Sequence, residues 1–121
     1  MESSKNINQY MVVLHGKPSE WSKHSDEEQK QLINRYMAWV EKLKTEGRFK
    51  KGSELHPNHR DLKTMNNKIV VDGPFPETKE VLTGFFIITA SNIEEAVEVS
   101  KGCPALCHGD WVQVYDMPNR E

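Results

Sequence analysis

The sequence predicts a single α+β domain with two helices on one face of a largely antiparallel sheet. Apolar residues recur at helical spacing after Ser25 and again after Ser91. Strand-like apolar segments lie before and after each of these predicted helices. Asn66-Asn67 forms a tight turn between two of the strand-like segments. The predicted order is strand, helix, strand, hairpin, strand, helix, strand, which combines helix crossovers with a hairpin. No segment predicts a second helical layer. We therefore expect a second copy of the chain to cover the other face of the sheet.

The first half of the chain predicts a strand followed by a long helix. Residues 10–15 form a mostly apolar run, typical of a buried strand. Ser25 and Glu28 form a capping box for a helix over about 26–46, which Gly47 ends. Apolar residues recur on one stripe of this helix, which is expected to face the core: Leu32, Ile33, Tyr36, Met37, Val40 and Leu43.

The second half predicts shorter elements. A short segment runs from Arg48 to a break at Pro57, and a hairpin turns at Asn66-Asn67, because Asn tolerates positive φ. The most apolar stretch, residues 81–90, is expected to be a central strand. A second capping box at Ser91–Glu94 predicts a short helix, and residues 111–115 alternate like a strand.

The composition excludes several classes of protein. The chain has 121 residues, 36% hydrophobic and 28% charged, with a net charge of −2, so a nucleic-acid binder that relies on phosphate neutralisation is disfavoured. No apolar run approaches the ~20 residues that cross a bilayer, and the start does not resemble a signal peptide. We expect a cytoplasmic protein with both cysteines as thiols, no membrane contact, a frayed lead over 1–8 and one domain over 9–121.

The loop over residues 72–80 is the first candidate site. Two prolines stiffen it, and rigid loops with clustered charge often carry function. Asp72 and Glu77 are candidate acid/base groups, Lys79 a candidate for orienting an anion, and Phe75 a candidate substrate contact. The alternative is a plain turn, in which Asp72 bonds backbone amides and Glu77 pairs with Lys79 at the surface.

Three further residues are candidates by their position in predicted elements. His15 ends the first strand, where it is either a proton shuttle assisting catalysis or a side chain satisfied by a backbone carbonyl. Glu54 is a binding candidate if it points inward and an ordinary surface acid if it does not. Tyr36 lies on the buried stripe, so it is either core or a hydroxyl at a pocket rim.

The segment Cys103–His108 contains two cysteines and a histidine, residue types that bind zinc or haem. His56 and His59 could supply the remaining zinc ligands. The Cys spacing of the segment differs from a zinc knuckle, and haem attachment requires export. We therefore expect no metal site and no cofactor.

Residues 72–80, Asp-Gly-Pro-Phe-Pro-Glu-Thr-Lys-Glu, resemble the signature of the DGPF branch of the YCII-related proteins. The resemblance extends to four other segments, and so to nearly the whole chain after residue 8: residues 10–16, 35–47, 52–57 and 103–105. It implies a ferredoxin-like fold, βαββαβ with an extra hairpin here, that pairs into a dimeric α+β barrel.

The resemblance implies little about chemistry. The resemblance places a His–Asp pair, proposed as catalytic in the wider superfamily, near Tyr36 and Cys103 of this chain, so that chemistry does not carry over. The first hypothesis is an enzyme or binder of a small molecule, with its pocket beside the DGPF loop. The alternative is a non-catalytic ligand-sensing or interaction protein, linked to sigma-factor-dependent transcription by family association alone. The sequence does not decide whether turnover occurs.

Overall fold

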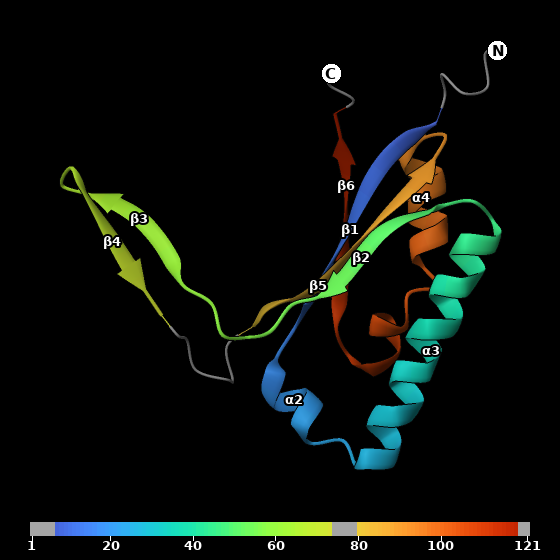
Figure 1. Ribbon diagram of the computed structural model, residues 1–121, viewed down its shortest axis with the longest axis horizontal. Coiled ribbons are helices and arrows are strands. Elements are labelled where there is room, and N and C mark those ends of the chain that lie inside the picture. Colours follow the sequence, from blue (N-terminus) through green and yellow to red (C-terminus); the bar gives the residue numbers. More distant parts are fainter. Residues whose placement is uncertain (1–6, 74–79, 119–121) are drawn as a thin grey trace.

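The computed structural model describes residues 7–73 and 80–118 and has the α+β architecture that the sequence predicts (Figure 1). The elements, in chain order, are β1 (Asn8–Gly16), α2 (Pro18–Ser22), α3 (Asp26–Thr45), β2 (Phe49–Glu54), β3 (Asp61–Met65), β4 (Lys68–Asp72), β5 (Val81–Ala90), α4 (Ile93–Ser100), the 3₁₀ helix η1 (Pro104–His108) and β6 (Trp111–Met117).

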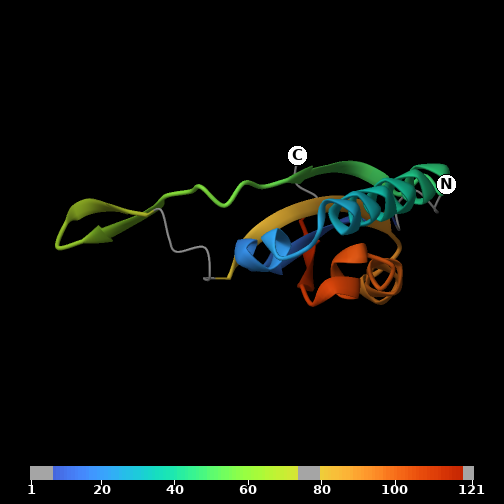
Figure 2. The ribbon, with the colours of Figure 1, turned by 90° about the horizontal axis from the view of Figure 1, so that it is seen from below.

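Four strands form the main sheet in the order β2-β5-β1-β6, and every neighbouring pair is antiparallel. Without the β3–β4 hairpin, the sequence order is βαββαβ and the spatial order is that of a ferredoxin-like fold. The long helices α3 and α4 lie on the same side of this sheet (Figures 1 and 2). The predicted fold class is therefore confirmed.

Local signals set both ends of α3. The Ser25 hydroxyl accepts a bond from the Glu28 amide, and the Glu28 carboxylate accepts one from the Ser25 amide, which completes the predicted capping box. At the other end Gly47 takes a φ of +75°, the left-handed conformation in which glycine ends helices. Helix α3 thus begins and ends where the sequence predicts, to within a residue.

The core lies between the helices and one face of the sheet. Its buried members come from β1, α3, β5, α4, η1 and the residue before η1: Tyr10, Val12, Leu14, Trp39, Leu43, Ile88, Ala90, Ala96, Ala105 and Cys103. The predicted stripe on α3 is only partly correct. Trp39 is buried and was not predicted, whereas Ile33 and Met37 are 50% and 61% exposed. These two residues border a cavity rather than the core.

Two short helices were not predicted. Helix α2 begins at Pro18, a residue suited to a first helical position, and occupies the stretch expected to be a loop through Trp21. The 3₁₀ helix η1 follows α4, again with a proline at its start, and ends at Gly109 with φ +92°. Helix α4 itself is capped by Asn92, whose side chain accepts from the Glu95 amide, one residue later than the predicted box.

The opposite face of the sheet is largely apolar along β1 and β5, although Lys51, Ser53 and Gln113 also lie on it, and no helix of the described residues covers it. Residues directly opposite each other in an antiparallel ladder share a face and successive residues alternate, which puts Met11, Phe85 and Ile87 on this face. Trp111 and Tyr115 of β6 lie on the same face and are 41% and 52% exposed. We call it the open sheet face. An apolar sheet face of this kind is normally packed against another layer of protein.

The β3–β4 hairpin projects away from the rest of the chain (Figures 1 and 2). Asn66 and Asn67 form its turn with φ values of +52° and +64°, as predicted. We call this hairpin the arm. Within the described residues, no helix is long and apolar enough to cross a membrane.

Candidate functional site

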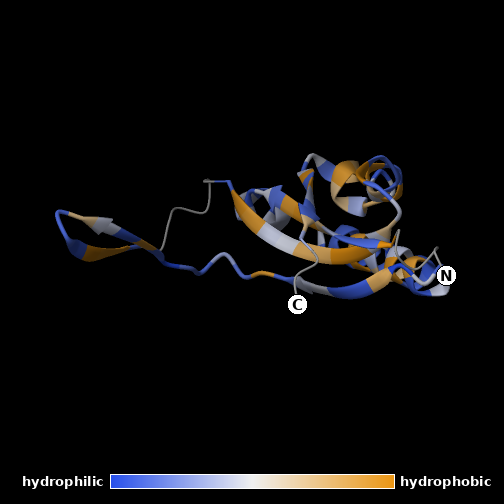
Figure 3. Ribbon diagram, turned by 90° about the horizontal axis from the view of Figure 1, so that it is seen from above, coloured by the Kyte–Doolittle hydropathy of each residue, from blue (hydrophilic) through white to orange (hydrophobic). Residues whose placement is uncertain are grey.

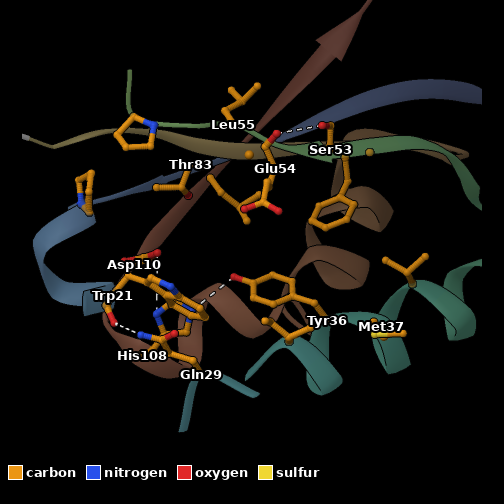
Figure 4. Close-up of a pocket in the computed structure, with 18 of the residues that line it drawn as sticks. Trp21, Gln29, Tyr36, Met37, Ser53, Glu54, Leu55, Thr83, His108 and Asp110 are labelled. Carbon is orange, nitrogen blue, oxygen red and sulfur yellow. Dashed lines mark hydrogen bonds and ion pairs between the residues drawn. The ribbon is translucent and has the colours of Figure 1, made fainter. Parts of the chain in front are cut away.

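A cavity of about 800 Å³ lies between α3, α2 and the helix-covered face of the sheet (Figure 4). This volume falls in the range of small-molecule sites, roughly 300–1,000 Å³. Its long walls are apolar and aromatic, with contributions from Trp21, Ile33, Met37, Phe49 and Phe86. Such walls bind an organic molecule by excluding water from its surface.

Polar groups gather at one end of this cavity. The Tyr36 hydroxyl lies 3.4 Å from His108 Nε2, and His108 Nδ1 lies 3.8 Å from Asp110 Oδ2. The side chains of His108 and Asp110 are only 12% and 15% exposed. In the tautomer whose Nδ1–H faces Asp110, Nε2 accepts the Tyr36 hydroxyl proton, so the three groups form a chain.

Elements far apart in the sequence hold this chain in place. Tyr36 comes from α3, His108 ends η1, and Asp110 stands at the start of β6 after the left-handed Gly109. Gly16, the last residue of β1, packs against the Asp110 carboxyl group. A Cβ at position 16 would lie 2.5–2.6 Å from three atoms of that group. The bare Cα of Gly16 therefore makes the space that Asp110 occupies.

The loop between α2 and α3 is fixed on the same side. The Gln29 side-chain amide donates to the carbonyls of Trp21 and His24 at 3.1 and 3.3 Å. The His24 ring then stands edge-on to the His108 ring, with centroids 6.1 Å apart. This packing helps to shield the polar end from solvent.

Burial shifts two groups of the chain toward their neutral forms. It raises the pKa of the Asp110 carboxyl, an effect that nearby His108 opposes and Glu80 reinforces. Burial also raises the pKa of the Tyr36 hydroxyl well above its usual range, with a smaller contribution from the acidic groups of Cys103 and Asp110. Tyr36 thus remains a neutral hydrogen-bond donor at any physiological pH.

The arrangement suits proton transfer. When a ligand group takes the place of the Tyr36 hydroxyl at Nε2, His108 can accept its proton, the ionised Asp110 carboxylate stabilises the resulting imidazolium charge, and the Tyr36 hydroxyl is free to donate to the ligand. The 3.4 Å Tyr36–His108 contact is a long hydrogen bond and the 3.8 Å His108–Asp110 contact is an ion-pair distance, and contacts of this kind often tighten when a ligand binds. Among residues 7–73 and 80–118, no group of three His, Cys, Asp or Glu side chains is placed to hold a metal ion.

Two of the residues predicted from sequence line this cavity. Tyr36 belongs to the polar chain, and Glu54 points into the cavity from the end of β2 (Figure 4). Glu54 is exposed, so its carboxylate is solvated at the mouth rather than buried without a partner. The structure therefore brings Tyr36 and Glu54 to opposite walls of one cavity.

The other predicted residues lie elsewhere or outside the described residues. His15 is on the open sheet face, stacked on Trp111 with ring centroids 4.0 Å apart, and its Nε2 lies 2.6 Å from Gln113 Oε1. Asp72 is exposed at the base of the arm, opposite Asp61, and does not line the cavity. Phe75, Glu77 and Lys79 lie outside the described residues. The roles predicted for all these residues stay predictions.

Sequence reasoning missed the acid/base potential of His108 and Asp110. His108 drew notice only as a possible metal ligand after Cys107, and Asp110 drew none. The available signal was the His-Gly-Asp segment directly before the last strand, because a glycine between two polar residues often marks a tight turn at a strand end.

Near the two positions where the family resemblance places a His–Asp pair, Tyr36 faces the cavity while Cys103 is 1% exposed. Burial raises the pKa of the Cys103 thiol to about 11, so it stays protonated. Cys103 cannot replace a carboxylate. The polar end instead takes its His and Asp from positions 108 and 110.

The topology and this cavity define a ferredoxin-like α+β protein with a helix-side pocket. The sequence of residues 9–117 matches the family model of the YCII-related domain, and the chain belongs to that family. One relative is the uncharacterized protein R00369 of Rhizobium meliloti (strain 1021). It is 30% identical over 95 residues, which cover 76% of this chain and 77% of that protein.

Proposed function

We propose that this protein binds a small organic molecule in the helix-side cavity and transforms it by proton transfer. The supporting observation is the Tyr36–His108–Asp110 chain at the inner end of an apolar cavity of about 800 Å³. Apolar walls hold the ligand, His108 acts as the base, Asp110 stabilises the imidazolium, and Tyr36 donates a hydrogen bond. The mouth, beside Glu54, admits the ligand.

The DGPF loop completes this proposal. Val81, which follows the loop directly, lines the cavity. We propose that Glu77 and Lys79 act on the same ligand, as the sequence suggests. Glu77→Gln and Lys79→Met would then weaken ligand binding or turnover while leaving the fold intact.

The protein is proposed to work as a homodimer. The open sheet face carries Met11, Phe85 and Ile87 together with Lys51, and the Glu80 carboxylate beside it accepts a hydrogen bond from the Trp111 indole at 2.8 Å, so two such faces can meet without burying an unpaired acid. Sedimentation at micromolar concentration tests this pairing.

A thermal-shift screen of small metabolites tests ligand binding, because a molecule that binds the folded state raises its melting temperature. A hit is then incubated with the protein, and solvent-deuterium exchange into the ligand is followed by mass spectrometry. We expect His108→Gln to abolish exchange while retaining binding within about tenfold. His56→Gln, at an exposed histidine that does not line the cavity, is the matched control and should exchange normally.

The outcomes separate the two functional classes. Binding without exchange in the wild type would favour a ligand-sensing protein and contradict the proton-transfer proposal. Equal exchange in the wild type and His108→Gln would exclude His108 as the base. A thermal shift that survives filling of the cavity by Met37→Trp would place the ligand elsewhere.

A further inference from the structure

The arm has one apolar face and one charged face. In its antiparallel ladder, residues directly opposite each other share a face, and successive residues alternate. One face therefore carries Leu62 opposite Val71 and Thr64 opposite Ile69, with no charged residue. We call this the apolar face of the arm. The other face carries the charged residues Asp61, Lys63, Lys68 and Asp72, together with Val70 and Met65.

The apolar face is exposed in the single chain. Leu62, Ile69 and Val71 are 66%, 71% and 59% exposed. The arm stands clear of the rest of the chain (Figures 1 and 2), and its hydrophobic residues appear in orange in Figure 3. A two-stranded hairpin is marginally stable alone, and alternation of this kind is typical of strands with one covered face. The pattern indicates that another surface covers the arm.

We propose that this surface belongs to a second copy of the chain, which receives the apolar face of the arm. The inference builds on the pairing proposed above. A standard interface uses about 20–30 residues a side, so the four residues of this face are too few to hold an unrelated partner alone. Added to the open sheet face of the same chain, they extend an interface toward that size. Twofold symmetry then covers both arms at once.

Charge is compatible with the same occupant. The apolar face of the arm carries no charged residue, whereas the open sheet face carries Lys51 and lies beside Glu80, whose carboxylate accepts a hydrogen bond from the Trp111 indole at 2.8 Å. Contact between them leaves Glu80 with this partner, while Asp61, Lys63 and Lys68 stay in solvent on the charged face. An acidic or basic partner surface would instead lose hydration against the apolar face.

The docking would act on the functional site. Leu55 and Pro57, in the segment that leads to the arm, line the cavity. Gly73, where the chain leaves the arm, packs against this segment, since a Cβ there would lie 2.7 Å from the His59 carbonyl oxygen. An arm held by a second copy would thus fix one wall of the cavity mouth. Assembly and ligand binding would share these residues.

Sedimentation velocity of matched variants tests the proposal. Ile69→Glu places a charge on the apolar face, and Val70→Glu places the same charge one residue later on the charged face, opposite Lys63. We expect Ile69→Glu to raise the dimer dissociation constant at least tenfold and Val70→Glu to leave it within twofold. A dimer unaffected by Ile69→Glu, or weakened equally by both changes, would overturn arm docking while leaving the sheet pairing intact.

Isotope mixing identifies the surface that is contacted. A photo-crosslinking phenylalanine analogue replaces Leu62 in ¹⁵N-labelled chains, which are mixed with unlabelled wild type. We expect crosslinks between labelled and unlabelled chains. Crosslinks confined to the labelled copy would mean that the arm folds back on its own chain, and would refute docking on a second copy. A wild type that sediments as a monomer would refute both the arm docking and the sheet pairing, but not ligand binding in the cavity.

Discussion

Gly16→Ala should displace Asp110 from the polar end of the cavity. A Cβ at position 16 would lie 2.5 Å from Asp110 Oδ1, whereas ordinary contacts of a Cβ begin at 3.4 Å. The carboxyl group must therefore retreat by about 1 Å. Gly16 does not have a positive φ, so the added methyl group causes no backbone strain, and the effect is steric.

The expected stability cost is small and the expected functional cost large. Overpacking costs about 1–3 kcal/mol, and rotation of the short Asp110 side chain places this case near the lower end. A catalytic group misplaced by about 1 Å can lose about 100-fold in rate. Displacement toward solvent also relieves burial, so the raised pKa of Asp110 should fall toward its ordinary value.

Carboxyl ¹³C NMR of Asp110 across pH, with urea denaturation of the same samples, measures both effects. Gly47→Ala is the matched control. Its φ of +75° makes a side chain costly by about 1–2 kcal/mol, yet a Cβ there meets nothing within 4 Å. The control should lose stability while Asp110 titrates as in the wild type. If Asp110 titrates identically in Gly16→Ala, the proposed contact does not govern its position.

Three other outcomes follow from the described geometry. Burial raises the pKa of Asp110 above 3.8, so stability from its protonated form is full below pH 3.8 and is lost as pH rises through the folded-state pKa. Asp110→Asn should therefore raise the melting temperature at pH 7, with the gain shrinking toward pH 3; a lower value at pH 7 would contradict the burial argument. Ellman's reagent should modify exposed Cys107 quickly but Cys103, with its pKa raised to about 11, only on unfolding, and two fast thiols would refute this. Ser25→Ala should cost about 1 kcal/mol in urea denaturation by removing the cap of α3, and an unchanged midpoint would show that the cap contributes nothing.

Local signals in the sequence predicted much of the fold. The capping box at Ser25, the glycine after α3 and the Asn66-Asn67 turn each act through near neighbours, so their chemistry is visible in a short window. The burial pattern of α3 was harder. Whether Met37 meets the core or a cavity depends on which element lies opposite, and helical spacing carries no information about that.

The site was less predictable because its members meet only in three dimensions. Tyr36 and His108 are 72 residues apart, and Gly16 touches Asp110 across the sheet edge. His15 shows the converse. Its place at a strand end was predicted, but alternation puts it on the open sheet face, where it stacks on Trp111.

The cavity and the arm are physically connected through the segment that leaves β2. Glu54 closes β2 with its side chain at the cavity mouth, and Leu55 and Pro57 continue along the same wall before the chain enters the arm. Leu55 remains tied to the sheet, because its amide donates to the Thr83 carbonyl at 2.9 Å. A change in the orientation of the arm must therefore take place in the backbone between Leu55 and β3, beside the cavity mouth. Asp110 and Pro57 line different parts of the cavity, so under the proposed arm docking, assembly would alter access at Pro57 without displacing the groups proposed for proton transfer.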